Sequence, residues 1–491
     1  MSCLSGISLT FDYKPCNMLS KFPENTQLNV FLTPLVSFIN LDHPLCKLAR
    51  EIRWEIIEKE LSPSYSHTGR PAHPIRRMAG LLILKHMKDL SDESLVVAWV
   101  ENPYFQYFCG EVNFQSRSPW DPTEMVRFRQ RIGDKGCEVI LSESIRIHHL
   151  EKEEKEVLVD TTVQEKNITY PTDTKLQVKI IVKCQEMAER NAIPIRQSYR
   201  RTLKKLRFQL RFRRSKRQRE LARKASRKIK VIANRLTKEL KRKIECQPTS
   251  PVRDLNLEKL KLFLRVLAQK PGDSHKVYSL HEPDVECISK GKEHKKYEFG
   301  NKSSFVRSRQ TGLVLGAMAF HGNPYDGHTL EAQLRQVERL TGKLPVTAIV
   351  DQGYRGTRLS LDTEIVHPNQ RRKLASPYQE RKRRAQLRAR ASIEPVIGHL
   401  KTDHRLIRNF LKGTSGDKIN TILAGAAFNF RKWINKVLSR LLNFLFQLLF
   451  LVLGKESGSP KDTIQLNQPL YLSTCWLIDF VIFWKKPVLQ A

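Results

Sequence analysis

The stretch Val157-Leu158-Val159-Asp160 is a short apolar, mostly β-branched run that ends in an aspartate. A second run, VTAIVD at 346–351, repeats this arrangement and ends in Asp351. Apolar runs of this length predict two β-strands, each ending in a carboxylate. Ligands bind at the carboxyl ends of strands in open α/β sheets, so Asp160 and Asp351 are candidate functional residues.

Further apolar runs lie between these two strands. YEFGNKSSFV at 297–306 alternates in part, and GLVLGAMAF at 312–320 has the length of a strand. HTLEAQLRQVERLTG at 328–342 then places leucines at helical spacing and ends in a glycine, which predicts a helix. Strands that alternate with helices indicate an α/β or mixed α+β domain.

The segment 30–135 has the pattern of a helical domain. Apolar residues recur at helical spacing over 74–88, and an aspartate followed by a proline starts another helix at Asp121, which we expect to end at Gly133. Three arginines lie along this last helix: Arg127, Arg129 and Arg131. Helix-turn-helix binding of DNA is one interpretation. Packing of three helices with no role in DNA binding accounts for the same residues equally well.

A strongly basic segment interrupts the strand pattern. Residues 200–243 hold 21 Lys and Arg against two Glu. Apolar residues still recur every three to four positions, which predicts the buried stripe of a helix: Leu221, Ala225, Ile229, Ile232, Leu236, Leu240 and Ile244. A second amphipathic segment at 255–269 completes a predicted helical hairpin, inserted over about 185–275.

The basic face of this insertion is expected to contact DNA phosphates, because neutralising many phosphates is the main use for such a density of cations. A charged face that is only solvated is the alternative. The candidate phosphate contacts in the insertion are Arg200, Arg201, Lys204, Lys205, Arg213 and Arg214.

The whole chain is strongly basic, like the insertion. Among its 491 residues, 86 Lys and Arg stand against 50 Asp and Glu, a formal net charge of +36. An excess this large indicates a polyanionic partner, and double-stranded DNA is the expected one.

The nine cysteines include no CxxC pair, which argues against a zinc ribbon and fits the reducing cytoplasm, where the protein is expected at the nucleoid. The apolar run at 441–453 is too short to cross a bilayer, so we expect a buried helix and no membrane partner.

A third candidate carboxylate lies in SIEPVIGHLK at 392–401. Pro395 disfavours α-helical geometry for the residue before it, so a helix is expected to start at Glu394. Lys401 follows Glu394 by two helical turns on the same face, and Arg390 precedes it by four residues. A carboxylate for a metal ion, flanked by cations for phosphates, fits this pattern.

The three carboxylates predict a metal site. Acids held close together need a cation between them to stay ionised, and Mg²⁺ prefers carboxylate oxygens. Two such ions activate an attacking water or hydroxyl and stabilise the leaving oxygen of a phosphodiester. Asp160, Asp351 and Glu394 are therefore the predicted ligands of two Mg²⁺ ions, with Mn²⁺ as a substitute. Taken singly, an aspartate after a strand is more often the cap of a turn.

These motifs together resemble those of a known enzyme family. VDTT at 159–162, VDQGYRG at 350–356 and RASIEPVIGHLKTDHRL at 390–406 look like the catalytic signature of DDE transposases of bacterial insertion sequences. The similarity is greatest to the group typified by insertion sequence five, and it covers about residues 30–450. Further similar stretches are YEFGNK at 297–302, GNPYDGHTL at 322–330, and residues 70–93 and 409–432.

The resemblance implies a ribonuclease-H-like catalytic domain with an insertion, in which Asp160, Asp351 and Glu394 bind two Mg²⁺ ions. The arginine, glutamate and lysine of the family's third motif map onto Arg390, Glu394 and Lys401. Some groups carry a tyrosine three residues before the arginine, where this chain has Leu387. Two more arginines next to these motifs are candidate DNA contacts: Arg355 and Arg405.

The predicted organisation has five parts. They are a tail at 1–29, a helical DNA-binding or dimerisation domain at 30–140, the catalytic domain at 150–432 with its insertion, an apolar helix at 433–454 and a tail at 455–491. The predicted function is that of a transposase that binds the terminal inverted repeats of its element, cleaves DNA and joins it to a target, as a homodimer or larger assembly. An inactive or domesticated DNA-binding derivative, and a nuclease that never joins strands, are the alternatives.

Overall fold

A computed structural model describes most of the chain between residues 33 and 453. The described segments are 33–66, residue 68, 71–149, 154–212, 214–270, 272–289, 296–368 and 376–453, the last without the side chains of 440–453. The tails predicted at 1–29 and 455–491, and the candidate residue Arg213, lie outside them.

The N-terminal part is helical, as the periodicity predicts. Its helices are α1 (Pro44–Glu51), α2 (Trp54–Leu61), α3 (Ile75–Met87), α4 (Asp92–Glu101), α5 (Pro103–Phe108) and α6 (Pro122–Arg146). Asp121 caps α6 by accepting the N–H of Thr123 at 2.9 Å. The predicted end at Gly133 is a kink rather than a terminus, because the glycine adopts φ 61° and the helix resumes beyond it.

One mixed sheet follows. Its strands are β1 (Glu156–Lys166), β2 (Glu286–Ile288), β3 (Glu298–Ser308), β4 (Val314–Phe320), β5 (Thr347–Ile349), β6 (Glu364–Val366) and β7 (Arg408–Asn409). The order is β2-β3-β1-β5-β6, with β4 paired to β3 and β7 to β1. β3 is antiparallel to β1 and β4, whereas β5 and β6 run parallel to β1. This mixed sheet with flanking helices confirms the predicted ribonuclease-H-like fold.

β1 is longer than its apolar core predicts. It pairs with β3 from Val157 opposite Ser308 to Glu165 opposite Gly300. Asp160 therefore lies within a strand rather than at its end, opposite Phe305. The polar residues after Asp160 stay extended because the neighbouring strand supplies their backbone hydrogen bonds, which a local pattern of apolar residues does not reveal.

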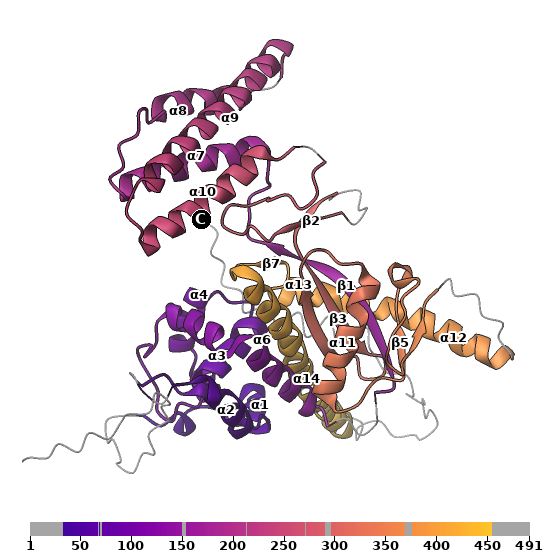
Figure 1. Ribbon diagram of the computed structural model, residues 1–491. Helices are drawn as coiled ribbons and strands as arrows, with labels where there is room; N and C mark the ends of the chain where they lie inside the picture. The colour runs from indigo at the N-terminus through magenta and orange to yellow at the C-terminus, as the bar shows by residue number, and fades with distance from the viewer. Residues whose placement is uncertain are drawn as a thin grey trace, which may run out of the picture. The chain divides into compact units, whose positions relative to one another are not determined.

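Helices surround the sheet (Figure 1). They are α11 (Asp326–Thr341), α12 (Pro377–Ala389), α13 (Ile393–Asp403) and α14 (Gly413–Leu453), with short 3₁₀ turns η3 (Gln352–Tyr354) and η4 (Arg390–Ser392). α13 begins one residue before Glu394, after η4 interrupts the basic helix α12, close to the start that Pro395 predicts. α14 spans both the end of the predicted catalytic domain and the predicted apolar helix at 433–454, and the division between these two parts stays a prediction.

A shared apolar core joins the N-terminal helices to the sheet. One cluster of buried side chains includes Leu141 of α6, Val159 of β1, Phe305 of β3 and Ile422 of α14. Gly425 lies on α14 where an added Cβ would approach Val314 within 3.0 Å, so the helix packs closely onto the sheet. The position of β1 is thus set by packing against helices from both the N-terminal and the C-terminal parts of the chain.

The basic insertion is a group of four helices with its own core (Figure 1). They are α7 (Asp173–Arg190), α8 (Arg200–Gln209), α9 (Lys216–Glu245) and α10 (Pro251–Ala268). The apolar stripe of α9 is buried with one exception, since Leu221 is 43% exposed and its neighbour Ala222 is buried instead. The structure adds α7 and α8 to the hairpin that the sequence predicts. None of the described helices is both long enough and apolar enough to cross a membrane.

Candidate active site

The register of β1 and β5 brings the chain segments of the two predicted aspartates together. The strands are parallel, and their pairing ends with Leu158 opposite Ile349. Asp160 follows Leu158 by two residues on β1, and Asp351 follows Ile349 by two residues at the start of η3. Local sequence places each acid after an apolar run, but only the pairing of two strands brings together these acids, which lie 191 residues apart along the chain.

Asp351 starts a tight turn that a glycine keeps open. Its carboxylate accepts the N–H of Gly353 at 2.9 Å and caps η3. A Cβ added at Gly353 would lie 2.9 Å from Asp351 Oδ1 and 3.0 Å from Asp326 Oδ2. Gly353 thus leaves space between two carboxylates, because a residue without Cβ allows the backbone to approach both closely.

Asp326 is a member of this neighbourhood that the sequence analysis missed. It is the first residue of α11, and its Oδ1 accepts the hydroxyl of Thr161 at 3.0 Å and pairs with Lys302 Nζ at 2.9 Å. Thr161 follows Asp160 directly, so α11 is tied to the catalytic strand. The signal that could have found Asp326 is the acid within GNPYDGHTL, at the start of a predicted helix.

The pKa of Tyr354 reflects the negative charge of the nearby aspartates. Its side chain is buried, and burial raises the pKa of the phenol well above its usual value, with further contributions from Asp326, Asp160 and Asp351. Three carboxylates from β1, α11 and η3 therefore lie around one buried ring. A site of concentrated negative charge on adjacent strands suits a hard divalent cation.

Glu394 reaches the same region through α13. Ile393 is buried in a small cluster with Leu158 and Ile349, the residues two positions before Asp160 and Asp351. The carboxylate of Glu394 itself is 63% exposed and lies 3.6 Å from the guanidinium of Arg390. Packing thus brings the start of α13 to the two aspartates, while the side chain of Glu394 is turned to a cation.

The chemical type of the candidate ligands suits a magnesium ion, but their positions do not yet form a complete site. All candidate ligands are carboxylate oxygens, which are the ligands that Mg²⁺ prefers. Across the described segments, however, no three His, Cys, Asp or Glu side chains come close enough together to hold a metal ion. Glu394 would have to leave Arg390 and turn toward Asp160 and Asp351 to complete the predicted set.

The predicted DNA contacts near this site differ in exposure. Arg390 is 28% exposed, Lys401 is half-buried on α13, and Arg355 is exposed directly after η3. Arg405 is the exception, because its side chain is only 14% exposed and pairs with Asp89 at 3.3 Å. Its guanidinium thus stabilises a contact within the protein.

The predicted contacts of the insertion lie on its surface. Arg200, the first residue of α8, pairs with Glu189 of α7. The other described candidates are all exposed: Arg201, Lys204, Lys205 and Arg214. These cations are far apart in sequence from the carboxylates and belong to a separate group of helices.

In the N-terminal part the structure separates the three arginines of α6. Arg129 is buried and holds Asp92 through both of its terminal nitrogens, at 2.9 and 2.7 Å. Arg131 lies over the ring of Tyr65, whereas Arg127 is exposed beside Glu124. A recognition helix that presents all three arginines to DNA is therefore excluded by the burial of Arg129.

Comparisons with known proteins place two transposase domains on this chain. Residues 34–131 match the transposase domain designated DUF772, and residues 272–430 match the transposase DDE domain. The chain belongs to the DDE transposase family. The second match contains Asp351 and Glu394, and the described helices of the insertion all lie between the two matches. Membership of the group typified by insertion sequence five stays a prediction.

A curated relative matches part of the chain. The uncharacterised protein ORF8 of the nfe locus of Rhizobium meliloti is 40% identical to this DDE transposase over 192 residues. The match covers 91% of that protein and 37% of this chain. No solved structure matches the chain.

Proposed function

We propose that this family member is a transposase that binds the terminal inverted repeats of its insertion sequence, cleaves a DNA strand there and joins the freed end to target DNA. The observation that supports the proposal is the parallel register of β1 and β5, which pairs Leu158 with Ile349, the residues two positions before Asp160 and Asp351. The packing of Ile393 against Leu158 and Ile349 adds Glu394 to the same region.

The reaction has two displacements at phosphorus. In the first, water attacks a phosphodiester at the element's end and the 3′-oxygen leaves as a hydroxyl. In the second, that 3′-hydroxyl attacks a target phosphodiester, so that one P–O bond forms as another breaks. The proton of each attacking group passes to solvent or to a carboxylate of the site.

Asp160, Asp351 and Glu394 would hold two Mg²⁺ ions, which supply positive charge to the attacking and leaving oxygens when bound. Arg390 of η4 and Lys401 of α13 would hold the phosphates that flank the reacting group. Pairing of Arg390 with Glu394 keeps both side chains near the site until DNA and cations separate them. We propose Arg355 as a further phosphate contact, because it is exposed directly after the turn that Asp351 caps.

The substitution Asp351→Asn tests this assignment. It removes the charge of the carboxylate but keeps an oxygen that can accept the N–H of Gly353, so the fold should be retained. Cleavage and joining of DNA that carries the element's ends should fall by at least about 1000-fold, equal to about 4 kcal/mol of activation free energy. Binding of the same DNA, followed by fluorescence anisotropy, should change less than about threefold. Full cleavage activity of the Asp351→Asn variant would contradict the assignment of Asp351 to the active site.

The same assay separates the alternatives. Binding of end DNA by the wild-type protein with no cut product at any divalent-ion concentration would indicate an inactive or domesticated DNA-binding derivative. Cut ends without a joined product would indicate a nuclease. A joined product supports the transposase.

We further propose that the protein acts in the cytoplasm at the nucleoid, and as a homodimer or larger assembly, because joining two element ends to one target requires two active sites. Cross-linking of the protein in the presence of end DNA tests this assembly. A complex with two copies of the chain supports it, and a complex with one copy contradicts it.

A further inference from the structure

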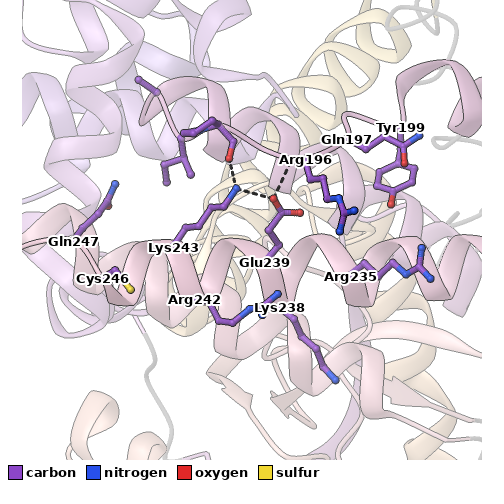
Figure 2. A pocket seen from close by; sticks show the side chains of 13 residues that line it. Arg196, Gln197, Tyr199, Arg235, Lys238, Glu239, Arg242, Lys243, Cys246 and Gln247 are labelled. Atoms are coloured by element: carbon purple, nitrogen blue, oxygen red, sulfur yellow. Dashed lines mark hydrogen bonds and ion pairs between the residues drawn. The ribbon is translucent and has the colours of Figure 1, made fainter.

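A cationic groove lies within the basic insertion, between α9 and the loop that joins α7 to α8 (Figure 2). Its volume is about 1360 Å³. The loop residues Ala192, Ile193, Pro194, Arg196, Gln197 and Tyr199 form one wall, and α9 and its end form the other: Arg235, Lys238, Glu239, Arg242, Lys243, Cys246 and Gln247.

One ion pair fixes the loop on the helix. Glu239 accepts the backbone N–H of Arg196 at 2.8 Å and pairs with Lys243 Nζ at 2.7 Å (Figure 2). Lys243 also donates to the carbonyl of Pro194, so two successive turns of α9 hold the loop. The loop is bounded by left-handed residues, Ala192 at φ 50° and Tyr199 at φ 56°. These contacts hold the loop against α9 and define the two walls of the groove.

The remaining cations of the groove have no acidic partner. Within the described chain, no carboxylate lies at ion-pair distance from Arg196, Arg235, Lys238 or Arg242, and Glu239 is already paired with Lys243. Arg235, Lys238 and Arg242 are spaced i, i+3 and i+7, which puts them on one face of α9. Figure 2 shows Arg196 reaching from the loop toward α9 beside Glu239. Like charges gathered in this way repel each other and attract a polyanion.

A second cationic groove lies on α8. It has a volume of about 490 Å³ and is lined by Arg200, Lys204, Arg207 and Arg211 together with Gln185, Leu203 and Phe208. Tyr199 of the first groove and Arg200 of the second are consecutive residues, so the insertion carries two cationic surfaces on neighbouring segments of the chain.

We propose that the groove between the 192–199 loop and α9 binds the phosphodiester backbone of duplex DNA, at a contact separate from the carboxylate site. This proposal rests on the proposed function, because a transposase has DNA as its substrate. Seven residues of α9 span about 10 Å, which matches about three nucleotides of one strand. Grooves for single strands present successive aromatic rings for stacking, whereas Tyr199 is the only aromatic residue that lines this one.

The double substitution Lys238→Gln and Arg242→Gln in the full-length protein tests the groove. Its matched control is Lys224→Gln and Lys241→Gln, which removes the same charge from α9 at cations that pair with Glu220 and Glu245 outside the groove. Binding of a random-sequence duplex is measured by fluorescence anisotropy over a series of salt concentrations without divalent ions. The groove variant should weaken binding about tenfold and lower the slope of log K against log salt by about 1.8, because each lost phosphate contact contributes about 0.9. The control should change the slope by less than about 0.5.

A groove variant with the wild-type slope, or a control with an equal loss, would overturn the proposal. A loss seen only with a single strand of the same length would overturn the assignment to duplex DNA. This result is distinguishable from the proposed function, since binding is measured without chemistry. If the wild-type protein cleaves DNA but the groove variant binds DNA normally, only the proposal for the groove is contradicted. If the wild-type protein never cleaves DNA but the groove variant shows the predicted change of slope, only the proposed transposase function is contradicted.

Discussion

At the residue scale, the candidate site depends on acids that lie together although like charges repel. Asp326 is held by Thr161 and Lys302, and its other oxygen faces the space that Gly353 leaves beside Asp351. Lys302 also donates to the carbonyl of Pro324 at 2.6 Å, so its ammonium is fixed in place. Asp326 thus adds negative charge next to Asp351 and neutralises the ammonium of Lys302.

Asp326→Asn should therefore weaken the binding of divalent cations. The substitution removes one negative charge and leaves Lys302 without its carboxylate partner, and both effects disfavour a cation at the site. The Mg²⁺ concentration that gives half of the Mg²⁺-induced rise in the thermal unfolding midpoint should increase about tenfold, equal to about 1.4 kcal/mol. Glu338→Gln, at an exposed position of the same helix, is the control and should leave this concentration unchanged. Equal values for Asp326→Asn and wild type would contradict the role given to Asp326.

At the scale of elements, a buried ion cluster joins α3, α4 and α6. Asp92 at the start of α4 pairs with Lys85 of α3 at 2.6 Å and with Arg129 of α6 at 2.7 Å. Both cations have side chains that are 6% exposed or less. Burial by itself raises the pKa of Asp92, but its hydrogen bonds and charge contacts with Arg129 and Lys85 outweigh it and lower the pKa to about 2. One carboxylate thus holds three helices together.

Asp92→Asn should destabilise the N-terminal helices strongly. It leaves two buried cations without a counter-charge, which costs about 3–5 kcal/mol in comparable cases. Urea unfolding followed by circular dichroism measures the loss. Glu124→Gln, which breaks the exposed pair with Arg127 on the same α6, should cost no more than about 1 kcal/mol. Similar losses for the two variants would show that burial of the cluster is unimportant.

At the scale of the whole molecule, two buried imidazoles connect the N-terminal helices to the catalytic domain. A ring nitrogen of His404 lies 3.0 Å from the backbone carbonyl of His86, and the ring of His86 lies 3.2 Å from Asn420 of α14. Burial lowers the pKa of His404 to about 4 and that of His86 to about 3. Both rings are therefore neutral in the folded protein at pH 7, at a contact between segments more than 300 residues apart along the chain.

Acid should weaken this contact. An unfolded histidine binds its proton near pH 6.5, whereas folded His404 does so only near pH 4, so the unfolded state takes up more protons between these values. The stability that neutral His404 contributes is complete above about pH 6.5 and is lost as pH falls toward 4, by about 1.4 kcal/mol for each unit of depressed pKa.

The comparison of wild type with His404→Gln isolates this effect. Asp417, whose pKa burial raises to about 6, has the opposite dependence in part of this range, but both proteins contain it. The wild-type free energy of urea unfolding should exceed that of the variant near pH 7.5, and the difference should shrink by pH 5. A difference that stays constant over this range would contradict the linkage.

The features that the sequence predicted well are those that depend on local order. The 3.6-residue period of apolar residues predicted α9, the Asp121-Pro122 pair predicted the start of α6, and apolar runs located the cores of β1 and β5. Its motifs also singled out Asp160, Asp351 and Glu394. Each of these signals lies within a few residues of the feature it predicts, so the chain itself carries the information.

The features that only the tertiary structure decided are contacts between distant segments. Arg129 has the sequence context of a DNA contact, yet its side chain is buried and pairs with Asp92 of another helix. Asp326 has the context of a helix start, yet Lys302 and Thr161 bring it to the catalytic strand. The partner of a charged group, and the register of one strand on another, are fixed by packing across the core, because a buried charge must find its counter-charge in space rather than along the chain.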